Sequence, residues 1–227
     1  KAAPKLCPVT LELGGKNPNI IMSDADLDIA IQGVIDGMRY TRQGQACTAG
    51  SRVYIQEKIY DKVINGAVEK LSKLKMGNAL DERSDIGAII SEEQLKRTLH
   101  YMDIAKQTSS AKVVHGGNQP TGGDYKNGFF YEPTLMSGVP VDSPVCQEEI
   151  FGPVACAIPF KTFEEVMQSA NDTPFGLSAV LWTQNLSRAL EFVEDIEAGF
   201  VQVNQCVAPR ANVSYGGLKM SGLGKEY

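Results

Sequence analysis

The sequence predicts an α/β fold: a mainly parallel sheet with helices on both faces. Three observations lead to this prediction. Short runs rich in β-branched residues alternate with amphipathic helical stretches along almost the whole chain, two helical stretches begin with a capping-box pattern, and no internal repeat or linker breaks the series. Repeated alternation is typical of parallel sheets, because each helix carries the chain back to the end where the previous strand began. We therefore expect one domain.

Strand and helix patterns follow one another closely in the first third of the chain. Strands are expected at 8–13, 19–22 and 52–56, where apolar and β-branched residues dominate. Ser23 is expected to cap a helix whose apolar residues recur at helical spacing, namely Leu27, Ala30, Ile31, Val34, Ile35 and Met38. A longer helix is expected at 58–76, with an inward stripe of Ile59, Val63, Ala67, Val68, Leu71 and Leu74.

The same alternation continues to the end of the chain. Helices are expected at 92–107, 163–170 and 185–196. The first two begin with a capping box, Ser91 with Gln94 and Thr162 with Glu165. Strands are expected at 111–115, 153–160, 177–183 and 199–204. The polar, glycine-rich stretch 116–128 is interpreted as a surface loop.

The charge balance limits the partners of the protein. Its 227 residues include 22 Lys and Arg and 27 Asp and Glu, which gives a net charge of −5. This balance favours solubility and supplies no basic surface, so neither nucleic acid nor anionic lipid is expected as a partner. No apolar run approaches the length of a membrane span and no signal peptide is recognisable, so no membrane association is expected.

The cysteines indicate a reducing compartment. They are odd in number, widely spaced and without a CxxC pair, at positions 7, 47, 146, 156 and 206. This pattern argues against a disulfide framework and a structural zinc site, so we expect no metal and a cytoplasmic location. The chain begins without Met and stops just after a glycine-rich run, which we interpret as the mark of a fragment.

One cysteine has unusual neighbours. Cys47 lies in RQGQACTAGSR (42–52), between Gly44 and Gly50 and without a strongly apolar side chain beside it. A cysteine kept for core packing usually lies among Val, Leu or Ile. The surroundings of Cys47 therefore indicate a role other than core packing.

Other motif interpretations fit poorly. The DADLD run has the acid spacing of a calcium loop, but Ile29 and Ile35 stand where glycine and glutamate are needed. The tail GGLKMSGLGKE satisfies neither phosphate-binding glycine pattern. A cysteine hydrolase needs a histidine base, and His100 and His115 are both better interpreted as structural or solvated.

Two glutamates are candidates for acid–base or binding roles. Glu12 ends an otherwise apolar expected strand, where a charge is costly unless it has a purpose or its pKa rises. The alternative is a carboxylate pointing outward from a sheet edge. Glu148 and Glu149 precede Phe151, a glycine and a strand-starting proline, which is by itself an ordinary entry into a strand.

Four stretches together resemble the aldehyde dehydrogenase superfamily. VTLELGGKNPNIIMSDADLD is similar to its glutamate motif, GQACTAGSR to its cysteine motif, EEIFGPV to its ribose-contact motif and YGGLKMSGLGKE to its closing signature. They occur in family order across almost the full chain. The resemblance implies the catalytic domain of the aldehyde dehydrogenase fold, an aldehyde substrate, and NAD or NADP as cofactor.

The resemblance also implies roles for individual residues. Cys47 is the nucleophile, and Glu12, which lies 47 − 12 = 35 residues earlier, activates the hydrolytic water. The implied cofactor contacts are Glu149 on the nicotinamide ribose, Phe151 on the nicotinamide ring, Leu13 and Gln94. The implied substrate-tunnel residues are Ala46, Thr48 and Tyr215. Phe200, Asn204 and Lys219 are expected to be structural.

The implied reaction oxidises an aldehyde to a carboxylic acid through a cysteine thiohemiacetal and a thioester. The resemblance divides the chain into a remnant of the cofactor-binding domain (1–14) and the catalytic domain (15–227), with a homo-oligomer expected for the full-length protein. The chain alone is then expected to be inactive. A coenzyme-A-acylating relative and a non-catalytic binding or structural domain are the alternatives. The acid at Glu12 argues against the first, and the set of Glu12, Cys47 and Glu149 against the second.

Overall fold

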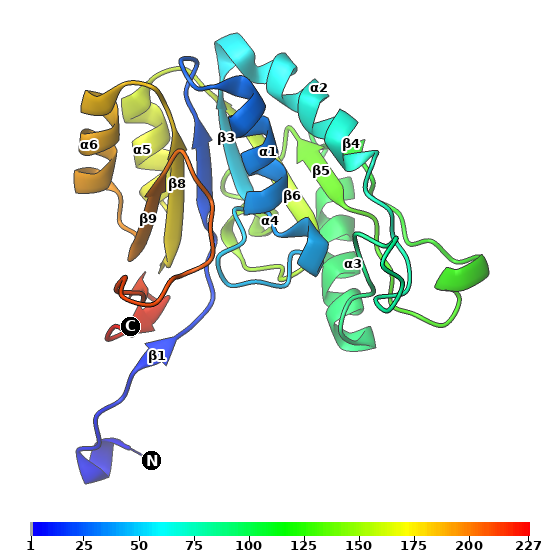
Figure 1. Ribbon diagram of the computed structural model, residues 1–227, viewed down its shortest axis with the longest axis horizontal. Helices are drawn as coiled ribbons and strands as arrows, with labels where there is room; N and C mark the ends of the chain where they lie inside the picture. Colours follow the sequence, from blue (N-terminus) through cyan, green and yellow to red (C-terminus); the bar gives the residue numbers. More distant parts are fainter. Residues whose placement is uncertain (1) are drawn as a thin grey trace.

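A seven-stranded sheet forms the centre of the computed structural model, which describes residues 2–227 (Figure 1). The strand order is β4-β5-β6-β3-β2-β8-β9. The strands are β2 (Pro18–Ile21), β3 (Arg52–Gln56), β4 (Lys112–His115), β5 (Thr134–Ser137), β6 (Val154–Phe160), β8 (Ser178–Trp182) and β9 (Phe200–Val203). Neighbouring strands run parallel except β4 and β5, which are antiparallel. The predicted mainly parallel sheet is confirmed.

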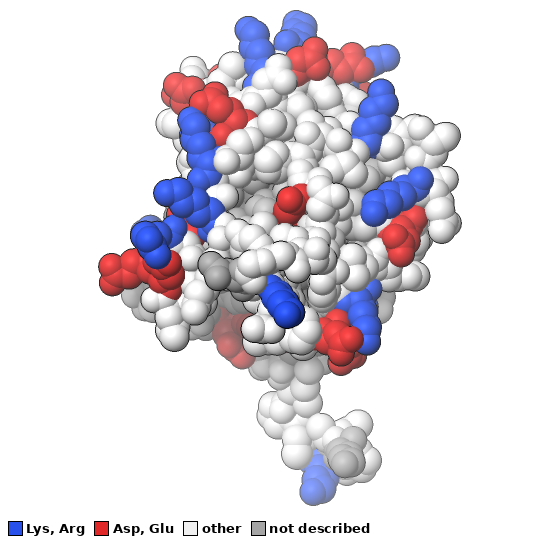
Figure 2. Space-filling view, turned by 90° about the vertical axis from the view of Figure 1, so that its right-hand side faces the viewer, with Lys and Arg blue, Asp and Glu red and all other residues white. Residues whose placement is uncertain are grey.

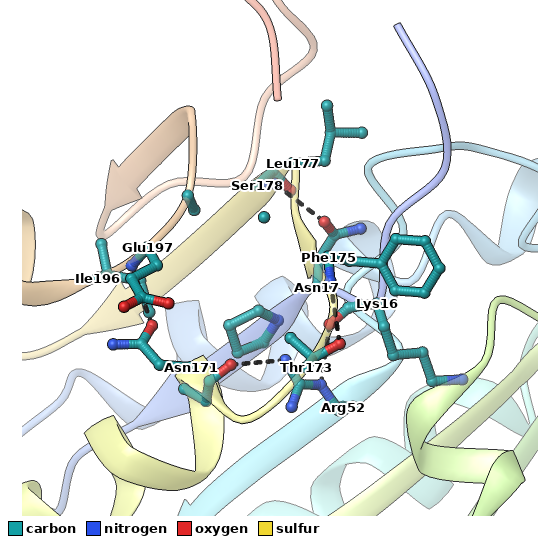
Figure 3. A pocket seen from close by; sticks show the side chains of 14 residues that line it. Lys16, Asn17, Arg52, Asn171, Thr173, Phe175, Leu177, Ser178, Ile196 and Glu197 are labelled. Atoms are coloured by element: carbon teal, nitrogen blue, oxygen red, sulfur yellow. Dashed lines mark hydrogen bonds between the residues drawn. The ribbon is translucent and has the colours of Figure 1, made fainter. Parts of the chain in front are cut away.

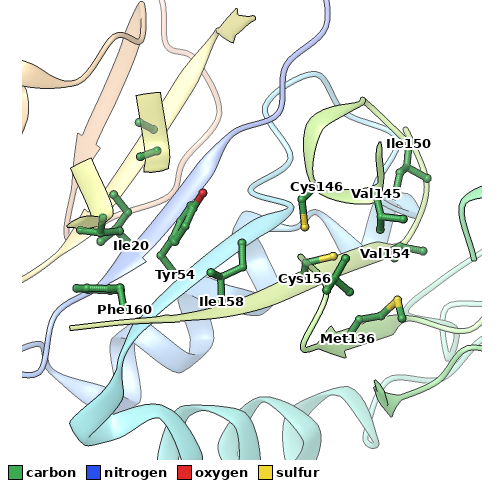
Figure 4. Close-up of a cluster of buried hydrophobic side chains, with 14 of the residues drawn as sticks. Ile20, Tyr54, Met136, Val145, Cys146, Ile150, Val154, Cys156, Ile158 and Phe160 are labelled. Atoms are coloured by element: carbon green, nitrogen blue, oxygen red, sulfur yellow. The ribbon is translucent and has the colours of Figure 1, made fainter. Parts of the chain in front are cut away.

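Helices cover both faces of this sheet, as predicted. On one face α1 (Leu27–Gly37) and α2 (Tyr60–Leu71) pack against Ile21, Val53 and Ile55. The other face carries α3 (Glu92–Lys106), α4 (Pro144–Gln147), α5 (Phe163–Asn171) and α6 (Leu186–Asp195). Figure 4 shows part of this second core, where Cys156, Ile158 and Phe160 of β6 point to the same side. The central strands are apolar because both of their faces are buried.

Short antiparallel pairs lie outside the main sheet. β1 (Leu11–Glu12) pairs with β11 (Gly222–Leu223), and β7 (Phe175–Gly176) pairs with β10 (Leu218–Lys219). Single 3₁₀ turns occur at Ala3–Lys5, Tyr40–Arg42, Glu57–Ile59 and Gly123–Tyr125. The segment before β1 extends away from the body of the molecule (Figure 1).

Two predictions about the early elements are wrong. The expected strand 8–13 is reduced to Leu11–Glu12 and does not join the main sheet. The helix after it is capped by Asp26, whose carboxylate accepts hydrogen bonds from Asp28 N and Ile29 N. Ser23 instead donates its backbone N–H to the Gln56 side chain. Aspartate is a strong N-cap residue. Asp26 directly precedes Leu27, the first apolar residue of the helix, so the helix begins there and not after Ser23.

The later elements differ from prediction mainly in length. Helix α2 ends at Leu71 instead of 76, and its first turn is the separate 3₁₀ turn Glu57–Ile59. Strand β5 and the four-residue helix α4 were not predicted. The loop 116–128 contains one 3₁₀ turn and otherwise no helix or strand. Helices and strands this short carry too few residues to display a period.

The loops that enter the parallel strands converge at one end of the sheet. Asn17 immediately precedes β2, Cys47 lies in the turn before β3, and Phe151 in the turn before β6. This is the amino-terminal end of the strands, whereas ligands of open parallel sheets usually bind at the carboxyl ends. The loops that carry Cys47 and Phe151 therefore lie at the opposite end of the strands from the usual ligand site of such sheets.

The exposed surface mixes both signs of charge. On the face shown in Figure 2, acidic and basic side chains are interspersed among uncharged ones. None of the helices in the described part of the chain is long and apolar enough to cross a membrane.

Candidate active site

Cys47 lies half-buried in a tight turn made of small residues. Ala46 N donates to Gly44 O at 3.0 Å, and Ala49 N donates to Ala46 O at 3.0 Å. Gly44 has a φ of +65°, and a Cβ there would lie 2.3 Å from Gly152 O. Only glycine therefore allows this turn to approach the Phe151 segment so closely. The backbone N–H of Cys47 has no acceptor among the residues that the structure describes, which leaves it available to an oxyanion.

Asn17 holds this turn from the neighbouring strand. Its Nδ2 donates to Cys47 O at 2.8 Å and to Ala49 O at 2.9 Å, and its Oδ1 accepts from Ser178 N at 2.9 Å. The side chain is 2% exposed and all its polar atoms are paired. No role for Asn17 was predicted from the sequence. The available signal was a pair of amides, Asn17 and Asn19, on either side of the proline that begins an apolar strand.

Arg52 is a second buried polar residue that the sequence analysis missed. It is 1% exposed, and its Nε donates to Lys16 O at 2.8 Å. Its Nη2 donates to Ala170 O at 2.8 Å and its Nη1 to Ser169 O at 3.1 Å, which places a cation at the C-terminal end of α5. Figure 3 shows Asn17 and Arg52 along a small pocket between the Lys16 segment and the strand that begins at Ser178.

Lys16 is almost completely buried at the same end of the sheet. It is 2% exposed, and burial lowers its pKa to about 8. The nearby Cys156 and Cys146 thiols and Glu149 oppose this decrease, whereas Arg52 adds to it. The Lys16 carbonyl accepts the hydrogen bond from Arg52 Nε. The segment before β2 therefore both anchors Arg52 and carries a buried amine.

Tyr215 lies directly against the candidate nucleophile. Its hydroxyl oxygen is 3.4 Å from Cys47 Sγ. The Phe200 ring packs against it edge-on, with ring centroids 5.5 Å apart, so Phe200 belongs to the apolar cluster around Cys47. Burial is the main cause of a strongly raised Tyr215 pKa, and the Cys47 thiol and Glu12 add to it. Ala46 and Thr48 are half-buried on either side of Cys47.

Glu12 is not at the end of a buried apolar strand. It lies on the exposed pair β1–β11, where it faces Gly222, and the neighbouring Leu13 is exposed, with its backbone N–H on Ser221 O. The pKa of Glu12 is raised, first by partial desolvation and then by the charge of Glu226. No hydrogen bond joins Glu12 to Cys47 within residues 2–227, although Glu12 acts electrostatically on Tyr215.

Glu149 reaches the glycine turn before β2. Its Oε1 accepts from Gly15 N at 3.2 Å, and a Cβ on Gly14 would lie 2.1 Å from its Oε2. The paired glycines therefore make room for the carboxylate. Burial raises the pKa of Glu149, against the opposing effects of Gly15 N–H, Arg97 and Lys16.

Phe151 occupies a strained conformation beside Glu149. Its φ is +58°, which is unusual for a bulky residue, and its ring is 36% exposed. Gln94 holds this turn, because its Nε2 donates to Ile150 O at 2.9 Å and to Phe151 O at 2.8 Å.

Both capping boxes are incomplete in the structure. Ser91 accepts from Gln94 N as predicted, but the Gln94 side chain is committed to the turn at Phe151 and does not return to the cap. Thr162 accepts from Glu165 N, whereas the Glu165 carboxylate accepts from Lys161 N. Gln94 therefore positions the Phe151 turn.

The remaining candidates make backbone contacts away from the nucleophile. Asn204 bonds both Thr183 N and Thr183 O, and Lys219 Nζ donates to the carbonyls of Asn171 and Thr173. His100 is exposed, and burial lowers the pKa of His115. Among the described residues no hydrogen bond joins either histidine to Cys47, and no three His, Cys, Asp or Glu side chains form a metal-holding group.

Comparison with known proteins gives one consistent result. The sequence profile of the "Aldehyde dehydrogenase family" matches residues 1–227. The putative aldehyde dehydrogenase DhaS of Bacillus subtilis is 41% identical over 99% of this chain and 44% of its own length. A betaine aldehyde dehydrogenase of Mesorhizobium japonicum is 38% identical over 99% of this chain and 46% of its own length.

Solved structures give the same picture. The betaine aldehyde dehydrogenase of Staphylococcus aureus in complex with NAD+ superposes with a TM-score of 0.94 at 36% identity, covering 99% of this chain and 44% of that one. The NAD+ complex of an aldehyde dehydrogenase from Bacillus cereus has a TM-score of 0.93 at 38% identity, with coverage of 99% and 44%. The chain thus spans less than half the length of these relatives.

Proposed function

The chain belongs to the aldehyde dehydrogenase family, and from this membership we propose that the protein oxidises an aldehyde to a carboxylic acid with NAD+ or NADP+. One observation carries the proposal: the half-buried Cys47 thiol lies in a turn fixed by Asn17, and its own backbone N–H has no acceptor within residues 2–227. A thiol beside a free N–H suits attack on a carbonyl, because the donor can stabilise the resulting oxyanion.

The first step forms a thiohemiacetal. The Cys47 thiolate attacks the carbonyl carbon of the aldehyde, a C–S bond forms, and the carbonyl electrons move to oxygen. The Cys47 N–H donates to this oxyanion. Removing one such donor typically costs about a hundredfold or more in rate, so the orientation that Asn17 gives to this turn matters for the chemistry.

The residues before β2 and β6 suit a dinucleotide cofactor. Glu149 offers a carboxylate to ribose hydroxyls, and Phe151 offers a partly exposed ring to a planar nicotinamide. Gly14 fits this arrangement, because a side chain there would fill the space of the carboxylate. The bound cofactor would supply the hydride acceptor that turns the thiohemiacetal into a thioester. The solved relatives in complex with NAD+ support this assignment.

The last step hydrolyses the thioester. Glu12 takes a proton from water, the water oxygen bonds to the acyl carbon, and the C–S bond breaks to return the Cys47 thiolate and release the acid. The raised pKa of Glu12 suits a general base. The exposed position of Glu12 implies that a further part of the protein must enclose the water.

We also propose that residues 1–227 alone are inactive. Glu149 and Phe151 can hold only the nicotinamide end, and no glycine-rich pyrophosphate turn occurs in this sequence. The chain matches only 44% of DhaS, so other segments of the relatives correspond to nothing here.

Two further proposals concern the setting of the full-length protein. Free cysteines throughout the chain support a reducing compartment such as the cytoplasm. Family membership supports a homo-oligomer and a small aldehyde as the reaction partner.

The test compares Cys47→Ser with the control Cys206→Ser in the full-length protein. Cys206 is also half-buried, but burial raises its pKa to about 11 and its sulfur contacts Gly33 O. Cys47→Ser should lower aldehyde-dependent cofactor reduction by about a thousandfold or more, and the control should leave it unchanged. Retained activity in Cys47→Ser would refute the assignment.

A second variant tests the hydrolytic step. Glu12→Gln should give a burst of reduced cofactor followed by little turnover, because the thioester accumulates. Product analysis with and without coenzyme A identifies the acyl acceptor. Release of an acyl-coenzyme A in place of the acid would replace the hydrolytic reaction by the acylating one.

A further inference from the structure

The hydroxyl of Tyr215 contacts the reacting atom of the proposed mechanism. Its oxygen lies 3.4 Å from Cys47 Sγ, within the usual range for a hydrogen bond to sulfur. Tyr215 is only 4% exposed, so the surroundings exclude most water from this contact. The aromatic ring alone would be enough to form an apolar tunnel wall, so the position of the hydroxyl needs its own explanation.

The direction of this hydrogen bond follows from the chemistry of the two groups. A thiolate has no proton and can only accept, whereas a phenol can donate. Burial, the Cys47 thiol and the charge of Glu12 all raise the pKa of Tyr215, so the phenol keeps its proton at neutral pH. Hydrogen bonds to charged groups are stronger than those between neutral groups, so this contact is strongest when the sulfur carries negative charge.

The surrounding structure holds the phenol in place. Phe200 packs edge-on against the ring, and Leu177 completes the apolar cluster around Cys47. Tyr215 N donates to Glu226 O at 2.9 Å, and Glu226 N donates to Tyr215 O at 2.7 Å. A donor fixed in this way needs no reorganisation when charge develops on the sulfur.

We propose that the Tyr215 hydroxyl is a catalytic hydrogen-bond donor to the sulfur of Cys47. This inference rests on the proposed function and assigns one further residue to it. The phenol donates to the thiolate before attack and again when the C–S bond of the thioester breaks and sulfur regains the electron pair. Its proton stays on the phenol oxygen throughout, so the balance of the reaction does not change.

The test measures the rate at which iodoacetamide alkylates Cys47 in the full-length protein, followed by peptide mass spectrometry. Tyr215→Phe keeps the ring and removes the hydroxyl. The matched control is Tyr60→Phe, which removes a hydroxyl that donates to Ala157 O, also at 3.4 Å. Alkylation at neutral pH should slow by about three- to tenfold in Tyr215→Phe and remain unchanged in the control. In turnover, kcat should fall with little change in KM, because the tunnel wall remains.

Alkylation of Tyr215→Phe at the wild-type rate would overturn the inference, and so would an equal decrease in Tyr60→Phe. If Tyr215→Phe fails to fold, difluorotyrosine at position 215 provides the second measurement. Its more acidic hydroxyl should accelerate alkylation, and an unchanged rate would count against the inference. Alkylation needs neither aldehyde nor cofactor. Slower alkylation in a protein that oxidises no aldehyde would therefore support the hydrogen bond and refute the proposed function.

Discussion

At the scale of single residues, buried polar side chains set the geometry around Cys47, the proposed nucleophile. Asn17 pairs with the carbonyls on both sides of Thr48 and with the backbone of β8. Gly44 is required because the Gly152 carbonyl approaches its backbone too closely for a Cβ, and Gly14 leaves the space that the Glu149 carboxylate occupies. The small residues around Cys47 therefore leave its side chain accessible and allow the turn before β3 to contact the turn before β6.

Lys16 provides a prediction at this scale. Its pKa is about 8 in the folded protein against 10.5 in the unfolded chain. Between these pH values the unfolded chain holds a proton that the folded protein has lost, so stability rises with pH over this window. Below pH 8 both states are protonated, and the burial of the charge costs about 3 kcal/mol.

The measurement is the free energy of unfolding of Lys16→Met and wild type between pH 7 and pH 10.5. The variant should be the more stable protein at pH 7, and the difference should close as the pH rises. Lys16→Arg stays charged over this pH range. The difference between its free energy of unfolding and that of Lys16→Met should therefore not close as the pH rises. A difference that does not vary with pH would contradict the lowered pKa.

At the scale of elements, one side chain connects two strands and a helix. Arg52 begins β3, bonds Lys16 O before β2, and donates to Ser169 O and Ala170 O at the end of α5. These three segments belong to different parts of the sequence. The Arg52 guanidinium therefore fixes the positions of these three segments relative to one another at the amino end of the sheet.

Arg52→Met is expected to lower the free energy of unfolding by about 3 kcal/mol, because three buried carbonyls lose charge-assisted donors. Arg83→Met is the control, since the Arg83 side chain is 86% exposed and, among residues 2–227, pairs only with Asp81. Urea denaturation followed by circular dichroism measures both. Equal stability of the two variants would show that the buried bonds contribute little.

At the scale of the whole molecule, a band of exposed apolar side chains flanks β1 and β11. It consists of Leu6, Val9, Leu11, Leu13, Met220 and Leu223. Exposed apolar patches of this kind mark surfaces that other protein segments cover. Glu12, the proposed general base, lies in the same segment, between Leu11 and Leu13 in the sequence.

We expect purified residues 1–227 to self-associate through this band. In sedimentation velocity, the double variant Leu11→Ser, Leu223→Ser should shift the distribution toward monomer. Leu80→Ser is the control, because Leu80 is 92% exposed on a distant loop. A monomeric wild-type chain, or an equal effect of the control, would contradict this prediction.

The sequence by itself determined the α/β class and the order of most of the main elements, and it singled out Cys47 by its neighbours. These features are local: helical spacing in α1, β-branched runs in β3 and β8, and the unusual neighbours of Cys47 can all be recognised within short windows. The cofactor and tunnel candidates came only from resemblance to a family.

Only the tertiary structure decided which residues far apart in the sequence contact one another. Cys47 and Tyr215 are separated by 168 positions, and Asn17 and Ser178 by 161. Such contacts depend on the order of strands and on the end of the sheet where the loops converge, which no local pattern encodes. For the same reason the exposed position of Glu12 could not be predicted, because β1 pairs with a distant strand, in which the residue that faces Leu11 is Leu223, 223 − 11 = 212 positions later. Local periodicity determines the elements, and long-range packing determines the site.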